Sequence, residues 1–201
     1  MTEGLLILFY KNPELGKVKT RLAATMGDEA ALAIYLHLAE HTRHITQQLA
    51  VDKVVYYARQ IEPDDQWPAQ VYGKRVQQGN DLGERLDHAV SKAFADGYRS
   101  VVVIGTDCLE LNEQILQQAF LALNENDAVI GPAKDGGYYL LGVNHHISAL
   151  FQNKDWSTET VFADTVKDFE TLKIPFVTLP LLSDVDREED LPGVLLARYK
   201  K

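Results

Sequence analysis

The chain has one cysteine, Cys108, among its 201 residues, so no intramolecular disulfide can form. Proteins without disulfides are typical of reducing compartments, and we expect a cytoplasmic protein. No stretch approaches the roughly 20 apolar residues that a membrane-spanning helix needs. The first apolar run, residues 4–10, also lacks the cationic lead of a secretory signal. We therefore expect no membrane partner.

Positive charge is scarce as well. The 20 Lys and Arg residues face 29 Asp and Glu residues, which gives a net charge of −9. A general nucleic-acid-binding protein would show a broad basic face, so we expect no nucleic-acid partner. The fingerprint G-x-G-x-x-G is also absent, which disfavours a dehydrogenase of the Rossmann type. A small phosphorylated ligand remains compatible with this composition, because one loop can be locally basic.

Hydrophobic residues make up 46% of the chain and charged residues 24%, as in ordinary globular proteins. The sequence contains no repeat, no low-complexity segment and no linker-like stretch. At this length we expect a single domain spanning residues 1–201, with a core large enough to need no disulfide or metal support. The oligomeric state is left open.

Apolar runs alternate with helical patterns along the chain, which predicts an α/β fold with a largely parallel sheet covered on both faces. Asp81 and Glu84 have the spacing of a capping box, and Asn112 is a second candidate N-cap. The expected strands are residues 4–10, 51–58, 74–78, 100–105, 127–132, 138–143 and 175–182. The expected helices are residues 28–49, 82–96, 113–123 and 158–172, with a last helix capped by Asp186.

The first strand leads directly into a basic loop. Four cations (Lys11, Lys17, Lys19 and Arg21) fall within eleven residues that hold one acid, Glu14. Positive charge at the carboxyl end of a first strand is where an α/β protein holds nucleotide phosphates. The P-loop pattern fails, because it would need glycine at position 11 and Ser or Thr at position 18. The loop is therefore either a phosphate cradle of backbone amides and cations or a solvated basic turn.

Two acidic segments could hold a divalent cation. Asp107 follows the most apolar strand, where ligands bind in open α/β sheets, and its carboxylate suits Mg²⁺ or Mn²⁺. A turn aspartate bonded to its own backbone is the alternative. Asp184 and Asp186 share one side of the chain if the segment is extended, and they could complete the metal site. Since Asp186 is also explained as an N-cap, Asp184 is the preferred ligand.

Two glycine-containing segments are further candidates. Asp135 precedes the adjacent glycines Gly136 and Gly137, which suit either a tight hairpin turn or close approach of the backbone to hydroxyls of a sugar or another acceptor. Gly79 lies at a helix entry, where it could contact a base or phosphate, and Arg85 could reach an anion. A simple helix entry is the alternative. The six histidines show no spacing typical of metal ligands.

Together these segments resemble a known family. The motifs that carry the resemblance are Pro13-x-x-Gly16-x-x-Lys19-Thr20-Arg21-Leu22, Asp81-Leu82-Gly83-x-Arg85, Gly105-Thr106-Asp107-Cys108, Gly131-Pro132-Ala133-x-Asp135-Gly136-Gly137-Tyr138-Tyr139-Leu140 and Asp184-Val185-Asp186-x-x-x-Asp190-Leu191. They are similar to those of a largely uncharacterised bacterial and archaeal group of glycosyltransferase-A-like transferases, some associated with radical-SAM or selenium-related gene sets. That group is similar in turn to phospholactate guanylyltransferase and, more distantly, to molybdenum-cofactor guanylyltransferase.

The resemblance runs from Leu5 to Leu191. It implies a three-layer α/β/α nucleotide-diphospho-sugar transferase fold, Rossmann-like, with a mostly parallel mixed sheet. It implies catalytic roles for Lys19 and Asp107, with Mg²⁺ or Mn²⁺ on Asp107 and on Asp184 or Asp186. The candidate substrate-binding residues, with Gly79 included for its place at the helix entry, are Pro13, Gly16, Lys19, Thr20, Arg21, Gly79, Arg85, Asp135, Gly136, Gly137 and Tyr138.

One departure from the family pattern stands out. The family has Pro-Asp after Thr-Asp-Cys, whereas this chain has Leu109-Glu110. The charge survives, but the stiffening effect of proline is lost, which puts a role for Glu110 in doubt.

The functional hypothesis is a metal-dependent transferase acting on a nucleotide substrate and an acceptor that the sequence does not name. It transfers either a glycosyl group from a nucleotide sugar or a nucleotidyl group from a nucleoside triphosphate. The alternative is a non-catalytic nucleotide-binding protein on the same fold, because fold does not fix function.

Overall fold

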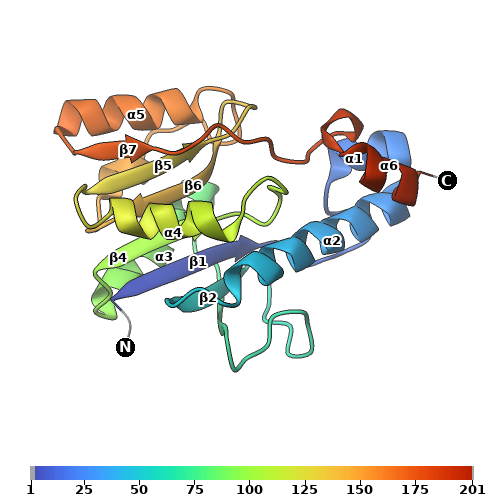
Figure 1. Cartoon of the computed structure of the whole chain (residues 1–201), viewed down its shortest axis with the longest axis horizontal. Coiled ribbons are helices and arrows are strands. Elements are labelled where there is room, and N and C mark those ends of the chain that lie inside the picture. Colours follow the sequence, from blue (N-terminus) through green and yellow to red (C-terminus); the bar gives the residue numbers. More distant parts are fainter. Residues whose placement is uncertain (1–2, 201) are drawn as a thin grey trace.

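Seven strands form one mixed sheet in the computed structural model, which describes residues 3–200 (Figure 1). The sheet order is β3-β2-β1-β4-β6-β5-β7, and every pairing is parallel except the two that β6 makes with β4 and β5. The strands are β1 (Gly4–Tyr10), β2 (Asp52–Tyr57), β3 (Gly73–Val76), β4 (Ser100–Ile104), β5 (Ala128–Pro132), β6 (Tyr138–Val143) and β7 (Phe176–Thr178).

Helices cover both faces of this sheet. They are α1 (Thr20–Met26), α2 (Asp28–Thr46), α3 (Leu82–Ala95), α4 (Glu113–Ala122), α5 (Val161–Leu172) and α6 (Gly193–Tyr199), with the 3-10 turns η1 (Ser148–Phe151) and η2 (Glu188–Asp190). Alternation along β1 explains the layers. Leu6, Leu8 and Tyr10 pack with α2 and α4, whereas Leu5 and Ile7 pack with α3 and α5. The predicted three-layer α/β/α fold is confirmed.

Several element boundaries differ from the sequence-based expectation. Helix α2 begins at Asp28 as expected but ends at Thr46, and α5 begins at Val161. Regular pairing of β7 stops at Thr178, because Pro180 has no N–H to donate to a ladder. The chain nevertheless stays beside β5, since the Leu182 amide donates to the Pro132 carbonyl at 3.1 Å.

The prediction that Asp186 caps the last helix is wrong. Helix α6 begins at Gly193, directly after Pro192, and the turn η2 precedes it. The Asp190 carboxylate, not that of Asp186, accepts hydrogen bonds from backbone amides in this segment, those of Asp186 and Arg187. The Asp186 carboxylate is therefore available to another partner.

Helix α1 was not expected. With the first turns of α2, η2 and α6, it forms a helical lobe beyond the carboxyl ends of the parallel strands (Figure 1). Leu22, Ile34 and Leu38 pack there with Val185 and Leu195 in a hydrophobic cluster separate from the two that flank the sheet. The lobe holds the first residues of α1 next to the carboxyl ends of the parallel strands.

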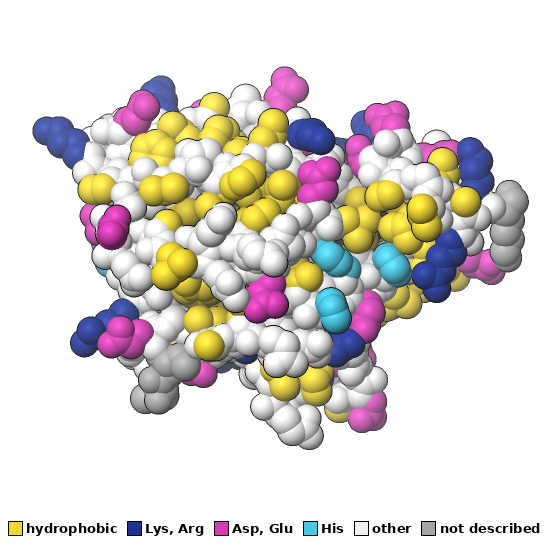
Figure 2. Space-filling view, in the orientation of Figure 1, with side chains coloured by type: hydrophobic (Ala, Val, Ile, Leu, Met, Phe, Trp, Pro, Cys, Tyr) yellow, Lys and Arg dark blue, Asp and Glu magenta, His cyan; other side chains and the backbone are white. Residues whose placement is uncertain are grey.

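On the face drawn in Figure 2, acidic, basic and hydrophobic side chains are intermingled, and no continuous basic stripe crosses that face. Within residues 3–200, none of the helices combines the length and the apolar character that a bilayer crossing requires.

The N-cap of α3 gives a first prediction. The Asp81 Oδ1 atom accepts a hydrogen bond from the Glu84 amide at 2.8 Å, which confirms Asp81 as the cap. We expect Asp81→Ala to lower the free energy of unfolding by about 1 kcal/mol, because an amide at the helix start loses its partner. Urea unfolding followed by circular dichroism measures the loss. Asp81→Ser, which keeps an acceptor, should recover most of it, and equal losses in the two variants would contradict the capping role.

Candidate functional site

The site lies at the carboxyl ends of β1 and β4, which pair in parallel, Leu8 opposite Ile104. The basic loop, residues 11–19, follows β1, and Asp107 follows β4 closely. Because parallel neighbours end at the same edge of a sheet, the fold brings the predicted basic loop and the predicted metal ligand together.

Lys19 and Asp107 form the central contact of the site. The Lys19 Nζ atom lies 3.0 Å from Asp107 Oδ2, and the Lys19 side chain is 8% exposed, against 41% for Asp107. Lys19 occupies the left-handed backbone region, with φ 47° and ψ 47°, at the N-terminus of α1. Such a conformation costs a non-glycine residue energy that the surroundings must offset. The turn into α1 directs the lysine toward the sheet.

Three contacts align the segment after β4 with residues 183–185. The Val185 amide donates to the Asp107 carbonyl at 2.9 Å, and the Ser183 amide donates to Glu110 Oε2 at 2.8 Å. The Cys108 thiol lies 3.6 Å from the Ser183 carbonyl oxygen. These contacts place Asp184 beside Asp107. They also give Glu110, at the departure from the family pattern, a defined structural role in holding the segment.

Asp184 is an unusual carboxylate. Its Oδ1 atom is buried and has no hydrogen-bonding partner among the described residues. Burial raises its pKa to about 7, the charges of Asp107 and Asp135 add to the rise, and Lys19 opposes it. A buried carboxylate oxygen that faces other carboxylates and lacks a donor is suited to receive a cation.

The raised pKa of Asp184 predicts how stability depends on pH when EDTA removes divalent metal. From its ordinary pKa of 3.8 up to about 7, the native protein holds a proton that the unfolded chain has released. Raising the pH through this window therefore lowers the free energy of unfolding. Asp184→Asn should remove this fall and unfold at higher urea concentration than the parent above pH 7. Asp64→Asn, an exposed control, should follow the parent, and parallel curves for Asp184→Asn and parent would contradict the prediction.

Asp186 has a different partner. Its Oδ2 atom accepts a hydrogen bond from Arg21 Nη1 at 2.7 Å, and the Arg21 side chain is 62% exposed. This bond is the main cause of the raised pKa of Arg21, to which the charge of Asp135 also contributes. Within residues 3–200, no three His, Cys, Asp or Glu side chains converge as a metal site. Asp107 and Asp184 therefore form a pair of neighbouring carboxylates, and Asp186 does not join them as a third ligand.

Two residues that the sequence analysis did not select hold the basic loop in place. The Tyr35 hydroxyl accepts from the Lys11 amide at 3.0 Å and donates to the Lys11 carbonyl at 2.6 Å. The buried Asn12 side chain accepts from the Arg59 amide and donates to the Gln60 carbonyl and to Glu62. In the sequence, Tyr35 fits the apolar face of its helix. Its hydroxyl group is the only feature that could have indicated a role in holding the loop. These side chains fix the shape of the loop.

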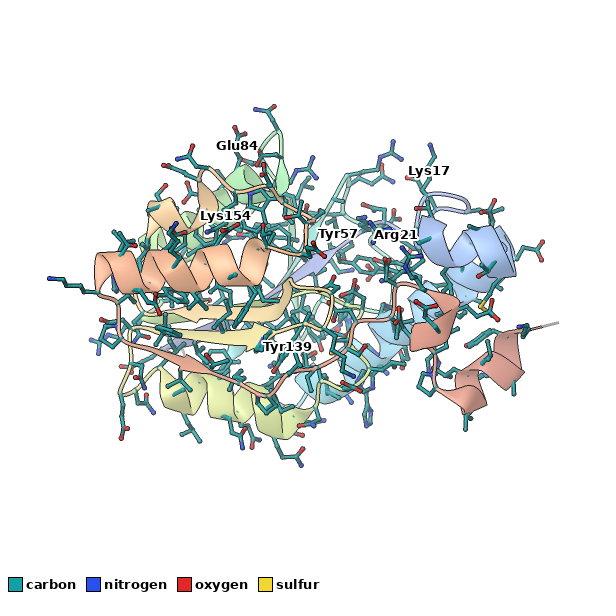
Figure 3. All side chains as sticks on the ribbon, turned by 90° about the horizontal axis from the view of Figure 1, so that it is seen from above. Lys17, Arg21, Tyr57, Glu84, Tyr139 and Lys154 are labelled. Carbon is teal, nitrogen blue, oxygen red and sulfur yellow. The ribbon has the colours of Figure 1, made fainter. Side chains whose placement is uncertain are left out.

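The remaining loop residues are more exposed. Gly16 adopts a positive φ of 73°, Pro13 is half-buried, and Thr20 is exposed at the first position of α1. Figure 3 shows Arg21 directed from α1 toward the sheet, whereas Lys17 projects away from the molecule. Of these two cations, Arg21 therefore faces the site.

The segment before α3 confirms the helix-entry interpretation. Gly79 has φ 137°, and a Cβ there would lie 2.7 Å from the Cβ of Glu84. Arg85 turns back, and its Nε atom donates to the Gly79 carbonyl at 3.0 Å. Contact of Gly79 or Arg85 with a nucleotide stays a prediction.

Residues 133–137 form the hairpin turn that the sequence allowed. The Gly137 amide donates to Asp135 Oδ1 at 2.9 Å, and Gly136 has φ 87°. The charge of Asp135 acts on both Arg21 and Asp184, so this turn borders the site. The Tyr138 ring instead packs edge-on against Trp156, on the side of the sheet covered by α3 and α5.

Several known proteins are similar to this chain. The family model described as "Uncharacterized protein conserved in bacteria (DUF2064)" matches residues 38–158. A crystal structure from Desulfovibrio desulfuricans G20, described as a "putative nucleotide-diphospho-sugar transferase", is 35% identical. It has a TM-score of 0.86, and the match covers 94% of this chain and 85% of that chain. No curated protein matches the chain.

Two more distant structures share the fold alone. The inositol-1-phosphate CTP transferase from T. maritima is 12% identical with a TM-score of 0.60, covering 98% of this chain and 96% of that chain. Rv0371c from Mycobacterium tuberculosis H37Rv, in complex with manganese, is 11% identical with a TM-score of 0.54, covering 94% and 96%. The fold is that of nucleotide-diphospho-sugar and CTP transferases.

Proposed function

The chain belongs to the DUF2064 family, whose description names no activity, and from its site we propose a metal-dependent transferase acting on a nucleotide. The reaction that we favour is nucleotidyl transfer from a nucleoside triphosphate to an acceptor. The observation that carries the proposal is the pairing of Lys19 with Asp107, beside Asp184, and of Arg21 with Asp186, where two parallel strands end. The cations suit phosphates, and the carboxylates suit a divalent metal.

The residues present fit a metal ion. Asp107 is partly exposed, and the neighbouring Asp184 has a buried oxygen without a donor, so these two carboxylates would hold Mg²⁺ or Mn²⁺. When bound, the ion would neutralise phosphate oxygens and stabilise charge that develops during transfer. The distant fold neighbour that was crystallised with manganese supports this choice.

The chain's own residues bind and orient the substrate. Lys19 and Arg21 neutralise the phosphates, and Pro13, Gly16 and Thr20 line the loop that Tyr35 and Asn12 hold in shape. In nucleotidyl transfer, an acceptor oxygen bonds to the α-phosphorus, the bond to the bridging oxygen breaks, and pyrophosphate leaves. Asp135 and the amides of the 133–137 turn border this space and would contact acceptor hydroxyls. Gly79 and Arg85 would contact the base or a phosphate.

The neighbour that is a CTP transferase favours nucleotidyl transfer, as does our proposed likeness to guanylyltransferases. The 35% identical structure favours glycosyl transfer from a nucleotide sugar as a second candidate. In that reaction the acceptor attacks the anomeric carbon and a nucleoside diphosphate leaves. As the site of action we propose the cytoplasm, where a single cysteine stays reduced.

Product analysis tests the proposal. A thermal-shift screen of nucleoside triphosphates and nucleotide sugars, each with and without Mg²⁺ or Mn²⁺, first identifies the ligand, because binding to the native state raises the melting temperature. Incubation of that ligand with a panel of hydroxylated acceptors follows. Release of pyrophosphate supports nucleotidyl transfer, whereas release of a nucleoside diphosphate supports glycosyl transfer. Binding without turnover on any acceptor would favour the non-catalytic alternative.

A further inference from the structure

Both cations that we assign to phosphate binding are already paired with carboxylates. Lys19 pairs with Asp107 and Arg21 pairs with Asp186, and each ion pair joins the start of α1 to a different acidic segment. Asp184 is left without a cationic partner of its own among the described residues. The carboxylates of the site therefore balance the charge of these cations at the position where metal and nucleotide would bind.

We propose, on the basis of the proposed function, that Lys19 is an internal counter-ion that keeps divalent metal off Asp107 until nucleotide phosphates draw the lysine away. Metal and nucleotide then bind as a coupled pair. Each should strengthen the binding of the other, because the nucleotide takes the ammonium group and the metal takes the freed carboxylate.

Burial makes the lysine an effective competitor. The Lys19 side chain is 8% exposed, so its ammonium group has little water around it and depends on the Asp107 oxygen 3.0 Å away. A metal ion on the same carboxylate would bring two cations together in a weakly solvated site, where their repulsion is poorly screened. A metal ion that binds without nucleotide must therefore displace the Lys19 ammonium group from Asp107 and leave that group without an anionic partner.

The geometry lets the ammonium group move while the backbone stays fixed. The Lys19 carbonyl accepts the Ala23 amide at 2.8 Å, which holds the residue at the start of α1. Its side chain ends in a compact charge on a flexible four-carbon stem, so the charge can pass from carboxylate to phosphate by rotation about side-chain bonds. The exposed Arg21 beside it can leave Asp186 in the same way.

Titration of the nucleotide-free full chain with Mn²⁺ tests this proposal, with free Mn²⁺ followed by electron paramagnetic resonance. Lys19→Met removes the charge and keeps most of the stem, and we expect it to bind Mn²⁺ at least about tenfold more tightly than the parent chain. Lys19→Gln, a second neutral variant, should behave in the same way if the methionine variant folds poorly. Lys17→Met, which removes an exposed cation outside the site, is the matched control and should leave the affinity unchanged.

The double variant Lys19→Met, Asp107→Asn locates the effect, because it should lose the gain in affinity. The proposal is overturned if neither neutral variant binds Mn²⁺ more tightly than the parent, or if Lys17→Met gains as much. It is also overturned if the double variant keeps the gain. The titration does not depend on catalysis. If the Lys19 variants bind Mn²⁺ more tightly but the parent protein shows no turnover, the proposed function is contradicted and the counter-ion role is supported. If the parent protein shows turnover but the Lys19 variants do not bind Mn²⁺ more tightly, the counter-ion role is contradicted and the proposed function is supported.

Discussion

Asp107→Asn is expected to lower nucleotide-dependent turnover by about 100- to 1000-fold, the usual loss when one electrostatic group of a transfer site is removed. Asparagine keeps the size of the side chain but removes the negative charge for which Lys19 and a metal would compete. The backbone contact to Val185 is unaffected, because it uses the Asp107 carbonyl. Initial rates of pyrophosphate or nucleoside diphosphate release, at saturating metal, measure the loss.

The control for this prediction is Asp64→Asn, which removes an exposed carboxylate from the loop after β2. It should leave the rate within about twofold of the parent, since a distant surface charge is screened by salt. Circular dichroism and urea unfolding establish that both variants fold. A folded Asp107→Asn protein with at least half of the parent rate would exclude Asp107 from the chemistry.

Gly136→Ala is expected to lower the free energy of unfolding by about 3 kcal/mol or more, the largest stability effect that we expect from a single methyl group. Gly136 has φ 87°, and an added Cβ would lie 2.1 Å from the backbone carbonyl oxygen of Glu159. Two backbones must therefore separate, and the turn that carries Asp135 must shift with them. For a chain of this size the melting temperature should fall by about 10 °C.

Gly97→Ala provides a matched control for Gly136→Ala. Gly97 also has a positive φ, 95°, but no atom of the other described residues lies within 4 Å of the Cβ that alanine would add. This control isolates the backbone strain, which should cost about 1–2 kcal/mol. Thermal and urea unfolding of the two variants separate the strain from the collision. Equal losses would mean that the turn moves freely away from Glu159.

Local patterns were enough to predict much of this fold. The apolar runs of β1 and β4 and the Asp81 cap each depend on a few adjacent residues, and each is confirmed. Helix α1 was missed because it has only seven residues and because the residue at its N-cap position, Lys19, supplies no capping side chain. The last strand was predicted too long because the apolar pattern continues past Pro180.

The pairing of charges could not be predicted in the same way. Asp186 followed by Glu189 has the local pattern of an N-cap, but its partner in the fold is Arg21, 165 residues away in the chain. Lys19 meets Asp107 only because β1 and β4 are neighbours in the sheet. The gathering of Lys19, Arg21, Asp107 and Asp184 followed from family motifs, whereas the assignment of each cation to one carboxylate needed the structure.

Helix α2 contributes side chains to two hydrophobic cores, that of the helical lobe and one that flanks the sheet. Ile34 and Leu38 pack in the lobe, whereas Tyr35, Ala39 and Ile45 pack against the sheet, so residues for the two cores interleave along the helix. Each residue inserted into the middle of such a helix would rotate all later residues by about 100° and shift them by about 1.5 Å, which would displace side chains from both cores. Insertions and deletions among related sequences should therefore be excluded from residues 34–45 and should accumulate in surface loops such as residues 144–147.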